Sequence, residues 1–226
     1  MSYYYSAPAS NVALFNLFKQ EIEGIKLAAS NHVTVELQVP TTGRVSSPTA
    51  GSNGSGGGPY YDFISARLRV KEPSSSYTKA MLLTAHFDSF VPEGVSESED
   101  ALGSMGEGMS DDAVGSAAVL ETFRVLATDS EAPLVDVILL LTNGEEVNYL
   151  GLDSFMASSP WAADVGFFIQ MDQSGSRGHA LAVFGDAQSG VACEGFFIYL
   201  QVGTDRYIDI LRHYVAYYSS DMLINV

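Results

Sequence analysis

The sequence predicts an α/β fold, a three-layer sandwich with a central, largely parallel mixed sheet flanked by helices. Apolar strand patterns alternate along the chain with the patterns of amphipathic helices. The strongest strand patterns are apolar at nearly every position, as in strands that are covered on both faces. The chain has 226 residues, which is within the size of one large core. We therefore expect a single domain over residues 1–226.

The N-terminal region predicts a helix followed by a strand. Apolar residues recur every three or four positions over residues 12–25, which is the pattern of an amphipathic helix. Ser10 or Asn11 could cap this helix at its N-terminus. Residues Val33–Val39 then alternate between apolar and polar, as a half-buried strand does.

Residues 41–59 are rich in Gly, Ser, Thr and Pro, and this composition predicts a flexible surface loop. The loop contains a glycosylation sequon at Asn53, which would matter only if the chain entered the secretory pathway. Whether Asn53 is glycosylated stays open from the sequence.

The middle of the chain predicts the strands of the central sheet and one further helix. Residues 113–127 repeat apolar side chains at helical spacing, after an acidic, glycine-containing loop at residues 89–110. The predicted strands are residues 61–70, 79–86, 135–142, 165–171 and 180–184.

Charge and composition exclude several classes of protein. The chain has 27 acidic and 11 basic residues and a formal charge of −16, so it lacks the basic surface that nucleic acids and anionic membranes require. Its longest apolar stretch, residues 134–141, is far shorter than the ~20 residues of a membrane-spanning helix. The single cysteine, Cys193, excludes an internal disulfide framework. This acidity is compatible with the binding of metal cations.

Polar residues of metal-binding type follow the predicted strands. His86 and Asp88 end one strand, the pair Glu145-Glu146 follows another, and Asp172 follows a third, while Asp111 directly precedes a helix. Ligands of open α/β sheets bind at the carboxyl ends of the strands, so these residues are expected to meet at one edge. Carboxylates together with a histidine are the donors expected for a catalytic dinuclear zinc site.

Each of these motifs also has an ordinary structural interpretation. Adjacent glutamates usually lie in a solvated loop, and Asp111 and Asp112 could be helix N-caps. His86 could be a hydrogen-bonded buried histidine, and Asp172 could begin a turn. The ordered occurrence of all four motifs favours a shared site over four coincidences.

At these residues the chain resembles the co-catalytic zinc exopeptidases of the aminopeptidase Y and glutamate carboxypeptidase type, most closely their endoplasmic-reticulum metallopeptidase and fungal vacuolar-protease branch. The similar segments are LLTAHFDS at 82–89, GMSDDAVGSAAVLETFRVL at 108–126, NGEEVNYLGLDSF at 143–155, and SSPWAADVGFFIQMDQSGSRGHALAVFG at 158–185. The resemblance implies a zinc-exopeptidase fold whose core spans about residues 33–185.

The resemblance also implies a role for each residue of the site. Asp111 would bridge two zinc ions, His86 and Asp172 would bind one of them, and Glu146 would bind the other. Glu145 would be the general base of peptide hydrolysis. Asp88 would support His86 without touching the metal.

The family's fifth ligand is a histidine near the C-terminal end of the domain, and no residue of this sequence matches it. His32 precedes the core, His179 stands where the family has no ligand, and His213 has the helical spacing of an ordinary helix residue, although it could substitute. We expect the chain to be truncated before this ligand or to be a natural domain with an incomplete site. A state with one zinc ion would then follow.

The expected function is metal-dependent hydrolysis of peptide bonds, of the aminopeptidase type. The alternative is a non-catalytic relative that serves binding or assembly, and a one-zinc glutaminyl cyclase of the same fold also remains open. The expected partner is a peptide, with no nucleic acid and no membrane contact through this segment, although a longer native protein could carry transmembrane helices. By resemblance alone, the expected location is the lumen of the endoplasmic reticulum or vacuole. Side-chain preference and oligomeric state cannot be predicted.

Overall fold

A computed structural model of the chain describes residues 8–40, 61–73, 76–89, 109–146, 149–173, 180–184, 196–201 and 223–225. Several features predicted from the sequence lie outside these residues. They are the loop at 41–59 with Asn53, residues 90–108 of the loop predicted at 89–110, His179, Cys193, and the segment that contains His213.

The predicted helices and strands occur in the predicted order. The elements of the described residues are α1 (Pro8–Ala28), β1 (Val33–Gln38), β2 (Phe63–Val70), β3 (Ala80–His86), η1 (Met109–Ala113), α3 (Val114–Thr128), β4 (Val137–Thr142), α4 (Leu150–Ser158), η2 (Ala162–Asp164), β5 (Val165–Gln173), β6 (Ala180–Phe184), β7 (Phe196–Gln201) and β8 (Leu223–Asn225). Of these, α4, β7 and β8 were not predicted.

The first helix begins earlier than the sequence pattern indicates. α1 starts at Pro8, so Ser10 and Asn11 lie within the helix and the predicted N-cap is wrong. Proline suits the first turn of a helix because the backbone N–H that it lacks would have no partner there.

The strands form one mixed sheet in the order β1-β2-β4-β3-β5-β7-β6-β8. The central strands β4, β3 and β5 run parallel to one another. β2 pairs antiparallel with β4 on one side, and β7 pairs antiparallel with β5 on the other. The predicted mixed α/β sheet is confirmed, with its parallel part at the centre.

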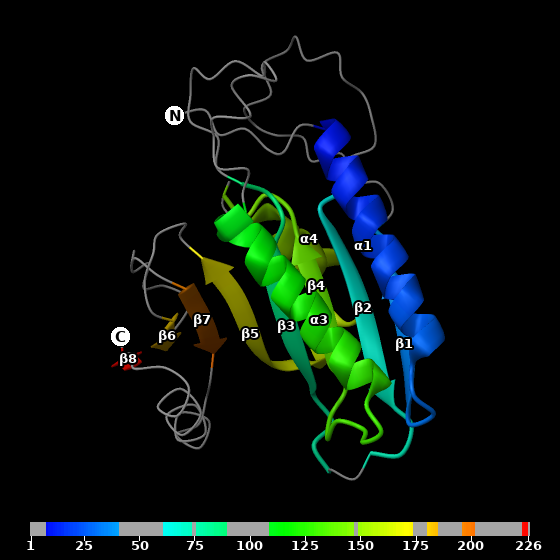
Figure 1. Ribbon diagram of the computed structural model, residues 1–226. Helices are drawn as coiled ribbons and strands as arrows, with labels where there is room; N and C mark the ends of the chain where they lie inside the picture. The colour runs from blue at the N-terminus through cyan, green and yellow to red at the C-terminus, as the bar shows by residue number, and fades with distance from the viewer. Residues whose placement is uncertain are drawn as a thin grey trace, which may run out of the picture.

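Helices lie on both faces of this sheet (Figure 1). α1 and α3 pack on one face through a core that includes Phe15, Ile22 and Phe123. On the other face Phe155 of α4 packs against Phe63 of β2, with their rings edge to face at a centroid distance of 5.6 Å. Both faces of the central strands are therefore covered, which is why β4 is apolar and fully buried over its whole length.

The register of the parallel strands brings three chain segments level at one edge. His86 of β3 lies opposite Thr142 of β4, and Thr84 lies opposite Gln170 of β5. Two residues further along β3 and β5, His86 and Asp172 are therefore side by side. The carboxyl ends of three strands meet at this edge, where the sequence predicts the site.

A buried arginine fixes the opposite ends of the strands. Arg67 of β2 is 4% exposed. It donates to Asp136, directly before β4, at 3.0 and 2.8 Å, and to Asp164 of η2, directly before β5. The other oxygen of Asp136 accepts the backbone N–H of Val70 at 3.0 Å. This network ties the starts of β4 and β5 to β2 and thereby helps to set the register that aligns the site.

The substitution Arg67→Met should lower the free energy of unfolding by about 3 kcal/mol, because it leaves Asp136 without its buried partner. The matched control is Arg124→Met on α3. Arg124 pairs with Glu121, and the two side chains are 48% and 58% exposed. That control should cost less than about 1 kcal/mol. Urea unfolding of both variants measures the difference, and equal losses would contradict a specific role for Arg67.

Candidate metal centre

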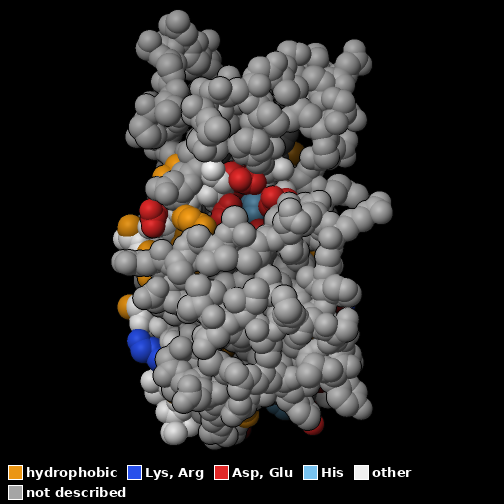
Figure 2. All heavy atoms as spheres, turned by 90° about the vertical axis from the view of Figure 1, so that its left-hand side faces the viewer, with side chains coloured by type: hydrophobic (Ala, Val, Ile, Leu, Met, Phe, Trp, Pro, Cys, Tyr) orange, Lys and Arg blue, Asp and Glu red, His pale blue; other side chains and the backbone are white. Residues whose placement is uncertain are grey.

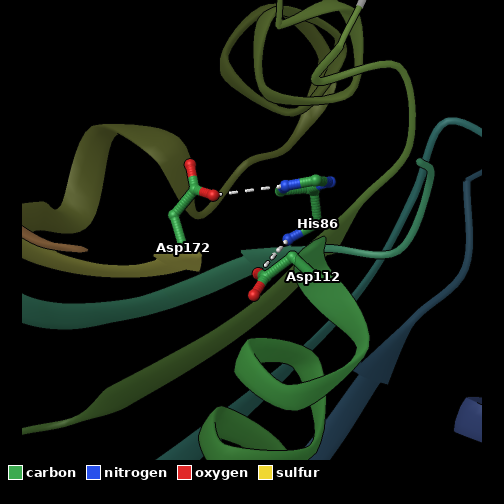
Figure 3. A group of neighbouring side chains, drawn as sticks. All are labelled: His86, Asp112 and Asp172. Carbon is green, nitrogen blue, oxygen red and sulfur yellow. Dashed lines mark hydrogen bonds and ion pairs between the residues drawn. The ribbon is translucent and has the colours of Figure 1, made fainter. Parts of the chain in front are cut away.

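A single histidine stands at the centre of the site, and acidic side chains surround it. His86 is 1% exposed. Its Nε2 lies 3.1 Å from Asp111 Oδ1, 3.4 Å from Asp172 Oδ1 and 3.9 Å from Glu145 Oε2. Figure 3 shows Asp172 pointing toward the imidazole, and Figure 2 shows acidic side chains gathered beside a histidine on one face of the molecule. Side chains from η1, from the turn after β4 and from β5 therefore converge on one ring nitrogen.

The other ring nitrogen of His86 is held by its own chain. Nδ1 lies 3.0 Å from the backbone carbonyl oxygen of Asp88 and 3.6 Å from Asp88 Oδ1. A proton on Nδ1 can be donated to this carbonyl, so in the neutral imidazole Nε2 carries the free lone pair. The side of the ring that faces the carboxylates is therefore the side that can bind a metal.

The carboxylate of Asp88 holds the glutamate pair in place. Asp88 Oδ1 accepts the backbone N–H of Glu145 and Oδ2 accepts that of Glu146, each at 3.2 Å. Asp88 is 2% exposed, so both bonds are shielded from water. Since its carbonyl also accepts from His86, one residue orients the imidazole and the turn that carries both glutamates.

Two adjacent aspartates, Asp111 and Asp112, have different roles at the start of α3. Asp112 is 1% exposed; its Oδ1 accepts the backbone N–H of Gly115 at 3.0 Å, and its Oδ2 accepts that of His86 at 3.4 Å. Asp112 thus satisfies a backbone N–H in the first turn of α3, which is the capping role that the sequence left open for it, and it also fastens α3 to the end of β3. Asp111, joined to it by a cis peptide bond, faces His86 Nε2 instead.

Within the described residues, three side chains offer ligand atoms that all lie within 4.8 Å of one another: His86, Asp112 and Asp172. This group contains Asp112 in place of the predicted Asp111. Because both oxygens of Asp112 already accept backbone N–H groups, while Asp111 directs an oxygen at Nε2, the hydrogen bonds favour Asp111 as the ligand and Asp112 as its anchor.

The electrostatics of the cluster indicate an excess of negative charge. Burial opposes protonation of His86, but hydrogen bonds with Asp111, Asp172 and Asp88 and the charge of Glu145 outweigh it and raise the pKa of the imidazole. Burial raises the pKa of Glu145 to about 7; the charge of His86 opposes this rise, and the charges of Asp172, Glu146 and Asp88 add to it. Burial likewise raises the pKa of Asp112 to about 8. A proton on His86 thus occupies the place that a dication would take.

This donor set fits a zinc ion. One imidazole nitrogen and several carboxylate oxygens are the ligands of catalytic zinc sites, and the second nitrogen of the imidazole is fixed by a hydrogen bond, as metal-bound histidines require. The carboxylates of Asp111, Asp172 and Glu145 reach the same nitrogen from different segments.

The structure brings most of the predicted residues together. His86, Asp88, Asp111, Glu145 and Asp172 lie within the contacts given above, while Glu146 joins through its backbone N–H and through the effect of its charge on Glu145. Asp172 pairs with Phe197 of β7 inside β5, so its interpretation as a turn residue is wrong. His32 precedes β1 at the opposite end of the sheet, too far away to join this cluster.

Two residues that hold the backbone of the site in place, Ser116 and Asn143, were not predicted from the sequence to have this role. Ser116 of α3 donates through its hydroxyl to the carbonyl of His86 at 2.7 Å. Asn143 donates to the carbonyls of Asp62, through its backbone, and Tyr61, through its side chain, which ties the glutamate turn to β2. The only signal for these residues was their place beside the recognised motifs.

The fold and the donor set together are those of a metal-dependent hydrolase, and comparison with known proteins gives the family. The profile of peptidase family M28 matches residues 66–222. The chain therefore belongs to peptidase family M28, whose members are in general zinc-dependent, and the predicted class of metallopeptidase is confirmed at the level of the family.

Individual relatives agree with this assignment. The chain is 32% identical over 178 residues to endoplasmic reticulum metallopeptidase 1 of Homo sapiens, covering 77% of this chain and 18% of that protein. It is 35% identical over 129 residues to vacuolar membrane protease of Yarrowia lipolytica, covering 57% and 11%. The crystal structure of the Legionella pneumophila LapA aminopeptidase has the same fold, with a TM-score of 0.62 and 16% identity over 99% of this chain and 50% of that one.

The chain thus spans less than a fifth of the length of these two curated relatives. In the part that the structure describes, none of the helices combines the length and the apolar character needed to cross a bilayer.

The close approach of α3 to the site can be tested at Gly115. A Cβ atom at this position would collide with the carboxylate of Asp112. We expect Gly115→Ala to lower the free energy of unfolding by about 2 kcal/mol through this overpacking. The control is Gly24→Ala in α1, where a Cβ would meet nothing within 4 Å; it should gain about 0.5–1 kcal/mol from helix propensity. A similar change in the free energy of unfolding in both variants would contradict the tight contact at Gly115.

The support behind the glutamate turn has a pH dependence. Burial raises the pKa of Asp62, against the opposing hydrogen bond from Ser154. A carboxyl group with a raised folded-state pKa stabilises the fold only while protonated, so its cost grows as pH rises through that pKa. Asp62→Asn removes this titrating group. The difference in thermal midpoint between the variant and the wild type should therefore be more favourable to the variant at pH 7 than at pH 3. A gain that is larger at pH 3 would contradict this sign.

Proposed function

We propose that this chain carries the catalytic centre of a zinc-dependent peptidase of the aminopeptidase type. The observation that carries the proposal is the buried imidazole of His86, whose Nε2 faces three carboxylates within 3.9 Å. A binding module has no need to bury so much like charge, because each carboxylate raises the cost of ionising the next. The family and the metallopeptidase relatives support the same proposal.

We assign the protein ligands of two zinc ions as follows. His86 and Asp172 would hold one ion, Glu146 would hold the other, and Asp111 would contribute its carboxylate to both. When bound, zinc at such a site supplies the acidification of a water molecule and the polarisation of a carbonyl group. The fixed Nδ1 of His86 supports this assignment, since it leaves Nε2 free for the metal.

Glu145 is the proposed general base. It removes a proton from water as the water oxygen attacks the peptide carbonyl carbon, and it returns that proton to the leaving nitrogen when the carbon–nitrogen bond breaks. Burial with neighbouring carboxylates raises the pKa of Glu145 to about 7 in the metal-free chain, so this carboxyl group binds a proton more readily than an exposed glutamate does. Asp88 keeps this carboxylate aligned through the backbone N–H of Glu145.

One observation favours a non-catalytic function. Among the described residues, His86 is the only histidine in the cluster, so an incomplete second zinc site remains compatible with the geometry. Under this alternative the chain would bind one zinc ion and serve binding or assembly.

We propose an endomembrane lumen as the location of the protein, because the relatives are named for the endoplasmic reticulum and the vacuolar membrane.

The substitution Glu145→Gln tests the proposed chemistry. It keeps the size of the side chain but removes the base, so kcat for a peptide with a free N-terminus should fall by about 10²–10⁴-fold. The zinc content, measured by elemental analysis, should remain that of the wild type. The matched control is Glu121→Gln on the exposed face of α3, which should leave kcat unchanged.

Three results would count against the proposal. A Glu145→Gln variant with wild-type kcat would remove Glu145 from the mechanism. A folded wild-type chain that binds zinc but cleaves no peptide would favour the non-catalytic alternative. Cleavage of an N-acetylated peptide at the rate of the free one would reject the aminopeptidase specificity.

A further inference from the structure

Ser116 is an unexpected residue for the face of α3 that it occupies. The buried positions of this face continue with Val119, Phe123 and Ala127, at the spacing of an apolar stripe. Ser116 is 2% exposed, and burying a hydroxyl group costs free energy unless the group is hydrogen-bonded. Alanine would also be the better helix former at this position. The packing of α3 therefore does not explain a serine here.

The backbone of His86 does explain it. Backbone groups along a strand point alternately to its two sides, and the N–H of Phe87 donates to the carbonyl of Thr142 in β4 at 2.9 Å. The N–H and the carbonyl of His86 therefore point to the other side of β3. The register between β3 and β5 on that side runs only to Thr84. His86 thus lies beyond the last strand pair, and its buried backbone groups need other partners.

Side chains of η1 and α3 supply these partners. Asp112 Oδ2 accepts the backbone N–H of His86 at 3.4 Å, as Figure 3 shows. Ser116 Oγ donates to the carbonyl oxygen of His86 at 2.7 Å. The peptide groups on both sides of the His86 Cα atom are therefore held, which fixes the direction of its Cα–Cβ bond. Since the carbonyl of Asp88 holds Nδ1, the direction of Nε2 is fixed as well.

We propose that Ser116 is a positioning residue of the metal centre, whose hydroxyl group aims Nε2 of His86 at the bound ion by holding the carbonyl of the same residue. This inference rests on the proposed role of His86 as a zinc ligand. Nε2 lies 3.1 Å from Asp111 Oδ1 and 3.4 Å from Asp172 Oδ1, so a small rotation of the His86 backbone changes the distances that a metal ion must match. Without the hydroxyl group, the longer bond to Asp112 is left to hold this backbone.

Zinc affinity tests the proposal through two substitutions at one position. Ser116→Ala removes the hydroxyl group and should raise the dissociation constant for zinc about tenfold, because the loss of a residue that orients a metal ligand weakens metal binding. Ser116→Thr keeps the hydroxyl group and should keep the constant close to that of the wild type. Its extra methyl group has room in the cavity of about 410 Å³ that Ser116 lines together with Leu14 and Phe18 of α1. Competition with a chromophoric chelator measures each constant.

The matched control is Val119→Ala, on the same buried face of α3. It should lower the thermal midpoint, because it removes buried methyl groups, and it should leave the dissociation constant for zinc unchanged. An unchanged constant in Ser116→Ala would overturn the inference. Equal rises of the constant in Ser116→Ala and Val119→Ala would also overturn it, since Ser116 would then act only through the packing of the helix.

A second measurement needs neither zinc nor activity. In metal-free protein labelled with ¹³C at histidine Cε1, the resonance that disappears in His86→Gln belongs to His86. We expect this resonance to shift in Ser116→Ala, because the ring moves relative to the carboxylates around it, and to stay in place in Ser116→Thr and Val119→Ala. An unshifted resonance in Ser116→Ala would contradict the positioning role. A wild-type chain that binds no zinc would reject the proposed function, while the resonance would still decide whether Ser116 positions His86.

Discussion

The site is governed by the burial of several carboxylates around one imidazole. Charges of like sign a few ångströms apart and away from water repel one another strongly, so the cluster needs either bound protons or a cation. In the structure this need appears as the raised pKa of His86 and of Glu145. The surrounding fold, from the register of β3 and β5 to the anchored start of α3, keeps these groups together against their repulsion.

Asp88 and Asp112 anchor the backbone segments that carry the repelling carboxylates. Neither faces the Nε2 of His86; each uses its carboxylate to accept backbone N–H groups from two positions. Asp88 joins the end of β3 to the glutamate turn after β4, and Asp112 joins the end of β3 to α3. These two anchors allow Asp111 and Glu145 to direct their oxygens toward His86. The acids that hold the backbone are therefore separate from the acids that face the imidazole.

The sequence predicts the sheet and the convergence of the site because both follow from simple patterns. Fully apolar strands such as β4 require cover on both faces, and polar residues after such strands must meet at the carboxyl edge. What the sequence could not predict depends on three-dimensional contacts. The capping role of Asp112 against the facing role of Asp111 is decided by a few hydrogen bonds between adjacent residues. Ser116 carries no motif, since its hydroxyl group acquires its partner, the carbonyl of His86, only in the fold.

Titration of zinc into the metal-free chain in a calorimeter, together with its thermal midpoint, tests most directly whether the carboxylates around His86 are held for a dication. If the carboxylates around His86 are held for a dication, zinc should bind with a stoichiometry of at least one and raise the midpoint, because a ligand that binds only the folded state stabilises it. A chain that remains folded, takes up no zinc in excess metal and melts at an unchanged temperature would contradict the account.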